Sequence, residues 1–143
     1  MCVSADRVYS RWYVSSSVSS ILCRALHLIR YEQPHAYQAI ADRLDGMTVR
    51  FDFDDTLFLT GEDDEILQSV DANGSDVAVS GDRAIVRCLV NGKITLTQAV
   101  YTGELEIAGA IGPLSCALSA ADFFIASLLR IDHTQELLTA LEA

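Results

Sequence analysis

The segment FDFDDTLFLT, residues 51 to 60, holds the residues of this chain best suited to chemistry. Asp52, Asp54 and Asp55 place three carboxylates within four positions, and Thr56 follows them directly. Asp residues also suit tight turns, because their side chains hydrogen-bond to nearby backbone groups. The segment is therefore either an acidic active site or two short alternating strands folded over an Asp-Asp turn, and the remaining sequence has to separate the two.

The six residues from Asp52 to Leu57 resemble the first motif of the haloacid dehalogenase-type phosphohydrolases. The resemblance implies that Asp52 attacks a phosphoryl group and that Asp54 acts as acid and base. In that class the first Asp ends a buried parallel strand, and such strands are nearly continuous apolar runs. Here the preceding residues alternate between apolar and polar and include Arg50. The context of the motif therefore favours the hairpin.

The other parts of such a phosphatase are incomplete in this chain. Ser80 and Lys93 are candidates for the later Ser or Thr and for the Lys of that class. Asp122 is the one internal candidate for a second acidic pair, which leaves Mg²⁺ short of the oxygen ligands that it needs. The chain after residue 60 also has too few strand–helix units for a doubly wound sheet. A Mg-dependent phosphatase that uses Asp52 and Asp54 is therefore the third of the functions considered.

The composition is that of one acidic domain with an apolar interior. The chain has 143 residues, of which 50% are hydrophobic, and a net charge of −10. Its mean hydropathy is +0.25 and its isoelectric point about 4.5. Such a chain repels phosphate backbones and anionic lipid surfaces, so we expect no nucleic-acid partner. The apolar fraction favours a thick core, an internal cavity or a surface that needs a partner.

The cysteines and histidines predict neither a metal site nor a cofactor. Cys2, Cys23, Cys88 and Cys116 are widely spaced, without the paired spacing of zinc ligands. No two of the three histidines stand four residues apart, as helical metal ligands would. All of the cysteines except Cys2 lie among apolar residues, so we expect buried free thiols. Free thiols favour a reducing compartment and a cytoplasmic location.

No transmembrane segment is expected, and at most a transient contact with membranes. The apolar N-terminal stretch WYVSSSVSSILCRALHLI is interrupted by serines and by Arg24. A spanning helix needs about 20 apolar residues. The same stretch lacks the compact apolar run and the cleavage site of a signal peptide.

Hydrophobic periodicity predicts alternating helical and extended segments. Helices are expected at residues 14–30, 35–44, 82–90, 95–102, 113–129 and 134–141. Strands are expected at residues 47–53, 56–59, 76–80 and 104–108, with a charged loop and an Asn-Gly turn at 61–75. Helix 82–90 is expected to bury Ala84, Ile85, Cys88 and Leu89. Helix 113–129 carries a broad apolar stripe that ends at Leu129, with Asp122 on a narrow wet edge.

The segment NGKITLTQAVYTGELEIAG, residues 91 to 109, resembles the signature of the sterol carrier protein type 2 family. That signature has a Gly-Lys/Arg-Leu/Ile step, a spacer, an Ala in a short helix, a Gly, an alternating strand and another Gly. The matching positions are Gly92-Lys93-Ile94, Gln98-Ala99, Gly103, Leu105, Ile107 and Gly109. Upstream, residues 76–82 resemble the family's third strand entering its helix, and residues 44–53 resemble its first strand after a helix. The resemblance is collinear from about residue 35 to about residue 130.

The resemblance implies an α+β fold, a mostly antiparallel sheet of about five strands covered on one face by helices. It divides the chain into an N-terminal helical extension, residues 1–34, and a lipid-binding domain, residues 35–143. In the family, sheet and helices enclose an apolar tunnel for a lipid. Two departures are Ala110, where many members carry an acidic residue, and the broken helix start at Ile111-Gly112-Pro113.

The resemblance assigns the cavity lining to inward-facing sheet and helix residues. The candidates are Phe51, Phe53, Leu57, Leu59, Val77, Val79, Ile85, Leu89, Leu105, Ile107, Leu114, Leu118, Phe124 and Leu128. Each of these side chains also suits plain core packing, and only the whole set predicts a ligand cavity.

The function predicted first is therefore non-catalytic binding or transfer of a lipid, a sterol or a similar apolar ligand, with no cofactor and no metal. The alternative is an accessory domain of a larger lipid- or isoprenoid-related assembly, whose apolar face docks a protein partner or a second copy of the chain. Family resemblance alone does not choose between the two.

Overall fold

A computed structural model describes residues 17–69, 74–131, 135–137 and 139 of the chain. The helices are α2 (Val18–Glu32), α3 (Pro34–Arg43), α4 (Arg83–Val90), α5 (Leu96–Tyr101) and α6 (Ile111–Leu128). The strands are β1 (Thr48–Asp52), β2 (Thr56–Glu62), β3 (Glu65–Ser69), β4 (Val77–Gly81) and β5 (Leu105–Gly109).

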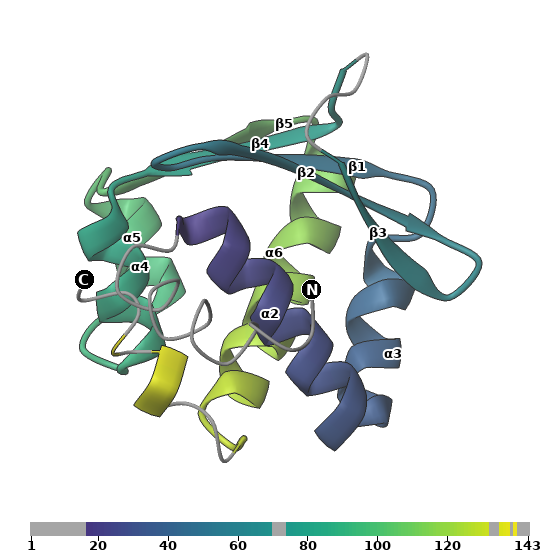
Figure 1. The fold of residues 1–143 in the computed structure, drawn as a ribbon. Coiled ribbons are helices and arrows are strands. Elements are labelled where there is room, and N and C mark those ends of the chain that lie inside the picture. The colour runs from purple at the N-terminus through teal and green to yellow at the C-terminus, as the bar shows by residue number, and fades with distance from the viewer. Residues whose placement is uncertain (1–16, 70–73, 132–134, 138, 140–143) are drawn as a thin grey trace.

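The five strands form one mixed sheet in the order β3-β2-β1-β4-β5. All neighbours are antiparallel except β1 and β4, which run parallel. The helices gather on one face of this sheet, and α2, α3 and α6 lie side by side beneath it (Figure 1). The predicted fold class, a mostly antiparallel five-stranded sheet covered on one face by helices, is confirmed.

The acidic segment at residues 51–60 is a hairpin. Strands β1 and β2 pair from Thr48 with Thr60 to Asp52 with Thr56. The connecting loop is closed by the Phe53 amide, which donates a hydrogen bond of 3.1 Å to the Asp55 carbonyl oxygen. The alternating pattern before the loop positions Val49 inward, 2% exposed. The structure thus confirms the hairpin interpretation of this segment.

A second hairpin corrects the charged loop expected at residues 61–75. Strand β2 continues to Glu62, and β3 returns from Glu65 along it. Asp63 and Asp64 form the turn with φ values of 52° and 64°. A two-residue hairpin turn with positive φ at both positions matches the twist of the strands, and Asp tolerates this conformation better than most residues.

The helices begin and end largely where turn and cap residues predict. Pro34 opens α3, and Thr95 caps α5 in a reciprocal pair of hydrogen bonds with Gln98. Helix α6 begins at Ile111, two positions before the predicted start at Pro113. A proline within the first turn is compatible with this start, because the amide that it lacks has no helical partner there.

The faces of two helices differ from those predicted. Helix α4 buries Val86 and Val90 together with Ile85 and Leu89, whereas Ala84 is exposed and Cys88 half-buried. On α6, Leu129 was expected in the buried stripe but is 52% exposed, because it caps the helix end. Asp122 is exposed, as predicted.

Gly61 marks the closest approach of backbone segments in the core. Its carbonyl oxygen accepts a hydrogen bond of 2.9 Å from Gly46, and its amide donates one of 3.2 Å to Met47. A Cβ atom at residue 61 would lie 2.8 Å from the amide nitrogen of Asp45 and would overlap the carbonyl of Leu44. Only glycine therefore lets β2 pack against the loop between α3 and β1.

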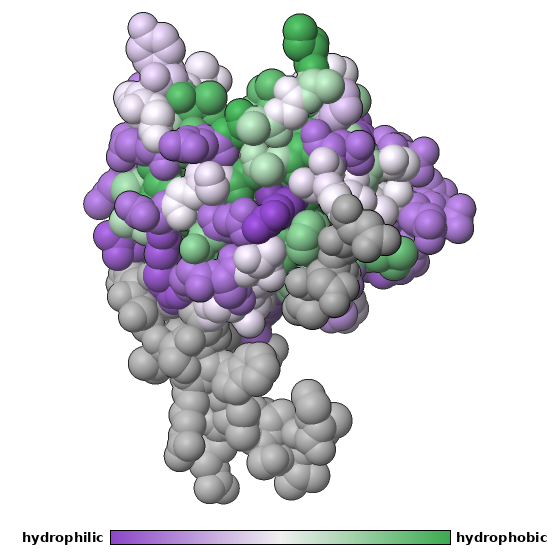
Figure 2. All heavy atoms as spheres, turned by 90° about the horizontal axis from the view of Figure 1, so that it is seen from above, coloured by the Kyte–Doolittle hydropathy of each residue, from purple (hydrophilic) through white to green (hydrophobic). Residues whose placement is uncertain are grey.

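The face of the sheet away from the helices is polar and hydrogen-bonded. Thr48 and Thr60 share a hydrogen bond of 2.9 Å across β1 and β2. Phe58 is the buried exception, and the guanidinium of Arg50 lies 5.8 Å from its ring centroid. Figure 2, which looks at the molecule from this side, shows hydrophilic and hydrophobic side chains interspersed.

Several predictions fall wholly or partly outside the described residues. These are the start of the first helix at residues 14–16, the turn residue Asn73, part of the helix at 134–141, Cys2 and residues 1–16 of the N-terminal extension. Of the cysteines within the described ranges, all have free thiols, as expected, and Cys23 and Cys88 are half-buried. Cys116 is exposed, which corrects its predicted burial and reflects its place on the outer side of α6.

Candidate ligand-binding cavity

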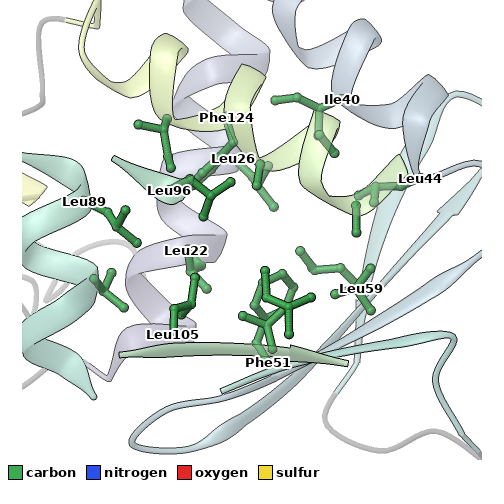
Figure 3. A pocket seen from close by; sticks show the side chains of 18 of the residues that line it. Leu22, Leu26, Ile40, Leu44, Phe51, Leu59, Leu89, Leu96, Leu105 and Phe124 are labelled. Carbon is green, nitrogen blue, oxygen red and sulfur yellow. The ribbon is translucent and has the colours of Figure 1, made fainter. Parts of the chain in front are cut away.

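A cavity of about 130 Å³ lies between the inner face of the sheet and the helices. Every one of its lining residues is apolar: Leu22, Leu26, Ile40, Leu44, Val49, Phe51, Phe53, Leu59, Val79, Val86, Leu89, Val90, Leu96, Leu105, Ile107, Ala117, Ala120, Ala121, Phe124 and Ile125. Figure 3 shows these side chains converging from α2, α3 and α6 on one side and from the sheet on the other.

The lining determines the chemistry that the cavity can perform. Its side chains offer no hydrogen-bond donor, no acceptor and no charge, so the cavity can stabilise only apolar groups by removing them from water. Its volume is comparable with the roughly 150 Å³ apolar cavity that stays dry and binds benzene in an engineered protein. In this conformation it therefore fits a group of about the size of one aromatic ring.

The cavity is partly open, and α6 supplies part of its accessible wall. Ala117, Ala121, Phe124 and Ile125 line it and keep part of their surface accessible. This explains why a helix so apolar is not fully buried. By length and composition alone, α6 is also the one helix in the described ranges that is able to cross a membrane, where the sequence led us to expect none.

Eight of the predicted lining residues surround this cavity. They are Phe51, Phe53, Leu59, Val79, Leu89, Leu105, Ile107 and Phe124. The other six lie outside it: Leu57, Val77, Ile85, Leu114, Leu118 and Leu128.

The six outlying residues have identifiable places. Leu57 packs in a smaller cluster with Leu26 and Leu59 at the β2 side of the sheet. Val77, Ile85 and Leu128 are buried in the main core, and Leu114 and Leu118 are half-buried against it. Alternation assigns a residue to the inner face of a strand, but it does not say whether helix or cavity covers that position.

Several lining residues were not singled out from the sequence. The clearest are Leu22 and Leu26 on α2 and Ile40 and Leu44 on α3. Helical spacing marked all four as apolar-face residues, and that signal was available. The spacing does not show which neighbouring element each apolar face contacts, because that depends on how the helices pack under the sheet.

The carboxylates of the acidic segment hold the N-terminus of α2. The Val18 amide donates a hydrogen bond of 2.8 Å to Asp54 Oδ1, and the Ser19 amide donates one of 3.3 Å to Asp55 Oδ1. The Ser19 hydroxyl also bonds Asp55. Arg83 Nη1 lies 2.8 Å from Asp54 Oδ2. Negative charge at a helix N-terminus is stabilising, so both side chains have a structural role here.

The environment of Asp55 alters its acidity. Partial burial raises the pKa of this carboxyl, but hydrogen bonds from Ser19 and Ser17 outweigh burial and hold the pKa below its usual range. The ionised form is therefore the one that anchors α2.

Asp52, the proposed phosphatase nucleophile, points to the outer face of the sheet. Its Oδ1 accepts a hydrogen bond of 2.8 Å from the Thr56 hydroxyl, and its Oδ2 lies 2.7 Å from Arg50 Nε. Among the described residues no three His, Cys, Asp or Glu side chains are grouped to hold a metal ion. The hairpin and its contacts with α2 give these Asp side chains structural roles that need no catalysis.

Comparison with solved structures identifies the architecture. A protein described as UbiJ-SCP2, a ubiquinone synthesis protein, matches with a TM-score of 0.53 and 24% identity over 75% of this chain and 87% of its own. The sterol carrier protein domain 2 of Helicoverpa armigera matches with a TM-score of 0.56 and 13% identity, over 78% of this chain and 87% of its own.

A crystal structure of sterol carrier protein 2 gives a TM-score of 0.55 and 13% identity over 80% of this chain and 97% of its own. No family model matches the sequence, and no curated protein matches it. The likeness is thus one of structure at low identity, and it agrees with the resemblance seen in residues 35–130. The chain has the sterol carrier protein 2 fold.

Proposed function

We propose that this domain binds a lipid or another apolar small molecule in its inner cavity, without catalysis. The observation that carries the proposal is the cavity of about 130 Å³ lined by apolar side chains alone. A plain core would close such a space, because protein interiors are packed to the density of organic crystals. The sterol carrier protein 2 fold supports the same proposal.

The binding energy in this proposal comes from desolvation. Each methylene group moved from water into the cavity contributes about 0.8 kcal/mol, so a chain of moderate length needs no polar anchor. A long acyl chain exceeds the volume seen here, so binding it requires α6 to move away from the sheet. Helix α6 is suited to this, because it contacts α3 far more than it contacts the strands.

An accessory role in a larger assembly is the second candidate. Its support is the exposed apolar side chains at the two ends of α6, Ile111 at 86% and Leu129 at 52% exposed. One structural neighbour is described as a ubiquinone synthesis protein, which fits a lipid- or isoprenoid-related assembly. This second proposal includes a protein partner or a homodimer, and a cytoplasmic location.

A Mg-dependent phosphatase is the weakest candidate, because Asp54 caps α2 and Asp52 bonds Arg50 and Thr56 on the sheet surface. It requires a phosphatase activity in the purified protein that the variant Asp52→Asn abolishes.

Native mass spectrometry of the purified protein, followed by organic extraction and lipid analysis, tests the ligand proposal. A co-purified apolar molecule at one per chain supports it and identifies the ligand class. A protein that is bare after purification and stays bare after incubation with mixed lipid extracts contradicts it. The mass of the bare species, monomer or dimer, then bears on the accessory role.

A further inference from the structure

A second cavity, of about 110 Å³, lies between α2 and the β2–β3 edge of the sheet. Its lining residues are Cys23, Leu26, His27, Arg30, Tyr37, Leu59, Ile66 and Gln68. Unlike the inner cavity it offers hydrogen-bonding groups, among them an imidazole, an amide, a phenol and a guanidinium. The helical spacing of Cys23, Leu26, His27 and Arg30 turns one face of α2 toward it.

The two cavities share a thin wall. Leu26 and Leu59 line both of them, and these side chains are 9% and 5% exposed. They belong to a small buried cluster with Leu57, against which Leu22, Cys23, Phe51, Ile66 and Phe124 pack. Figure 3 shows Leu26 and Leu59 among the side chains that line the inner cavity, Leu26 from the helical side and Leu59 from the sheet. Joining the cavities requires these two side chains to rotate apart.

The polar cavity has hydrogen-bonding capacity to spare. Within the described part of the chain, the side chains of His27 and Gln68 make no hydrogen bond, although both line the cavity. Tyr37 is 6% exposed, and its hydroxyl oxygen accepts a bond of 3.0 Å from the Ile66 amide, which leaves its O–H free to donate. A ligand group placed here meets both donors and acceptors.

The charges around the polar cavity disfavour an anion. Arg30 is engaged by both oxygens of Glu65, at 3.2 and 2.7 Å, and its guanidinium lies 5.2 Å from the Tyr37 ring centroid. The pKa of the Cys23 thiol is raised, first by burial and then by the negative charge of Asp55. Arg30, the one Arg or Lys of the lining, is thus already paired with a carboxylate, and the net charge of the chain is negative.

We propose that the two cavities form one site for an amphipathic molecule with an uncharged polar head. The apolar body occupies the inner cavity, the chain passes between Leu26 and Leu59, and the head hydrogen-bonds to His27, Gln68 and the Tyr37 hydroxyl. This inference rests on the proposed function, since it needs an apolar ligand in the inner cavity. It adds the ligand's head-group class and its orientation.

Displacement of the neutral fluorophore N-phenyl-1-naphthylamine by decanol, decanoate and decane tests the inference. The three competitors share one chain length and differ in the head. The full chain is compared with the variants His27→Leu and Gln68→Leu, and with His35→Leu, an exposed histidine of α3 outside both cavities, as the matched control. The side chains of all three residues are at the surface, so the fold is expected to survive each change.

We expect decanol to displace the fluorophore at lower concentration than decanoate. We also expect His27→Leu and Gln68→Leu to weaken decanol about threefold to tenfold, the size of one lost hydrogen bond, with decane unchanged. Equal effects of the variants on decanol and decane, or a preference for decanoate, overturn the inference while the ligand proposal stands. Failure of the fluorophore and of every competitor to bind overturns both.

Discussion

A substitution that fills the inner cavity should weaken ligand binding while the protein still folds. Ala121 of α6 lines the cavity, and its side chain is half-buried. The substitution Ala121→Phe adds one aromatic ring at this position. The cavity volume of about 130 Å³ is close to the roughly 150 Å³ that accommodates benzene, so the added ring takes the space of the ligand.

The expected effect on stability is small because two terms oppose each other. Burying the ring stabilises by about 1.5–3 kcal/mol. Forcing new atoms into a space slightly smaller than ideal costs about 1–3 kcal/mol. The free energy of unfolding should therefore change by no more than about 2 kcal/mol, which moves the thermal midpoint by no more than about 8 °C.

The expected effect on binding is large. Titration with N-phenyl-1-naphthylamine, whose three rings require the same movement of α6 as a long acyl chain, should show at least a tenfold weaker affinity, which is about 1.4 kcal/mol. Ala126→Phe is the matched control, because Ala126 lies on the same helix but is exposed and outside the cavity lining. Wild-type affinity in an Ala121→Phe protein of unchanged stability would refute the assignment of the cavity as the binding site.

Three further predictions concern the fold itself. Asp54→Ala should lower the free energy of unfolding in urea by about 1–2 kcal/mol, because it removes the carboxylate that accepts from the Val18 amide at the N-terminus of α2 and the ion pair with Arg83. Gly61→Ala should lower it by about 2 kcal/mol or more, since the new Cβ meets backbone, whereas Gly74→Ala, where the space is open, should change it little. The Asp55 carboxyl has a lowered pKa in the folded state, so its contribution is present above the unfolded value of 3.8 and is lost as the pH falls through the folded value. Asp55→Asn should accordingly flatten the loss of stability between about pH 5 and pH 2, and an unchanged acid profile would argue against the anchoring role.

Local signals in the sequence predicted several caps and turns, although they missed the turn at Asp63 and Asp64 between β2 and β3. Pro34 opens a helix, and Thr95 with Gln98 forms a capping box. The hairpin between Asp52 and Thr56 followed from alternation on both sides of an acidic turn. These features depend on neighbouring residues only, and short-range patterns record them well.

Strand β3 was not predicted, because its apolar and polar residues do not alternate regularly along the sequence. It is an edge strand, and on its inner side it presents Ile66 and Gln68 while Leu67 is 46% exposed on the other. A polar residue therefore lies on the inner side of the strand and an apolar one on the outer side, and the acidic residues before the strand suggested a loop. Pairing with β2 stabilises the strand, and that contact is not visible in a single segment.

Helix α6 shows the opposite difficulty. Its residues are apolar nearly all round, so periodicity cannot say that Leu128 is buried while Leu129 is exposed. The same limit applies to Leu114, Leu118 and Leu128, the predicted lining residues of α6 that lie outside the cavity. Leu22 and Leu26 were set aside for another reason, because the family resemblance began at about residue 35 and α2 lies before it.

The most direct test of the inner cavity as the binding site is to find which residues a bound ligand touches. Intermolecular nuclear Overhauser effects between N-phenyl-1-naphthylamine and methyl-labelled Leu and Ile side chains report this. Binding in the inner cavity predicts contacts with Leu22, Leu89 and Leu105, which line it from α2, α4 and β5. Contacts confined to Ile111 and Leu129, the exposed ends of α6, would contradict it and would mark that helix as the binding surface instead.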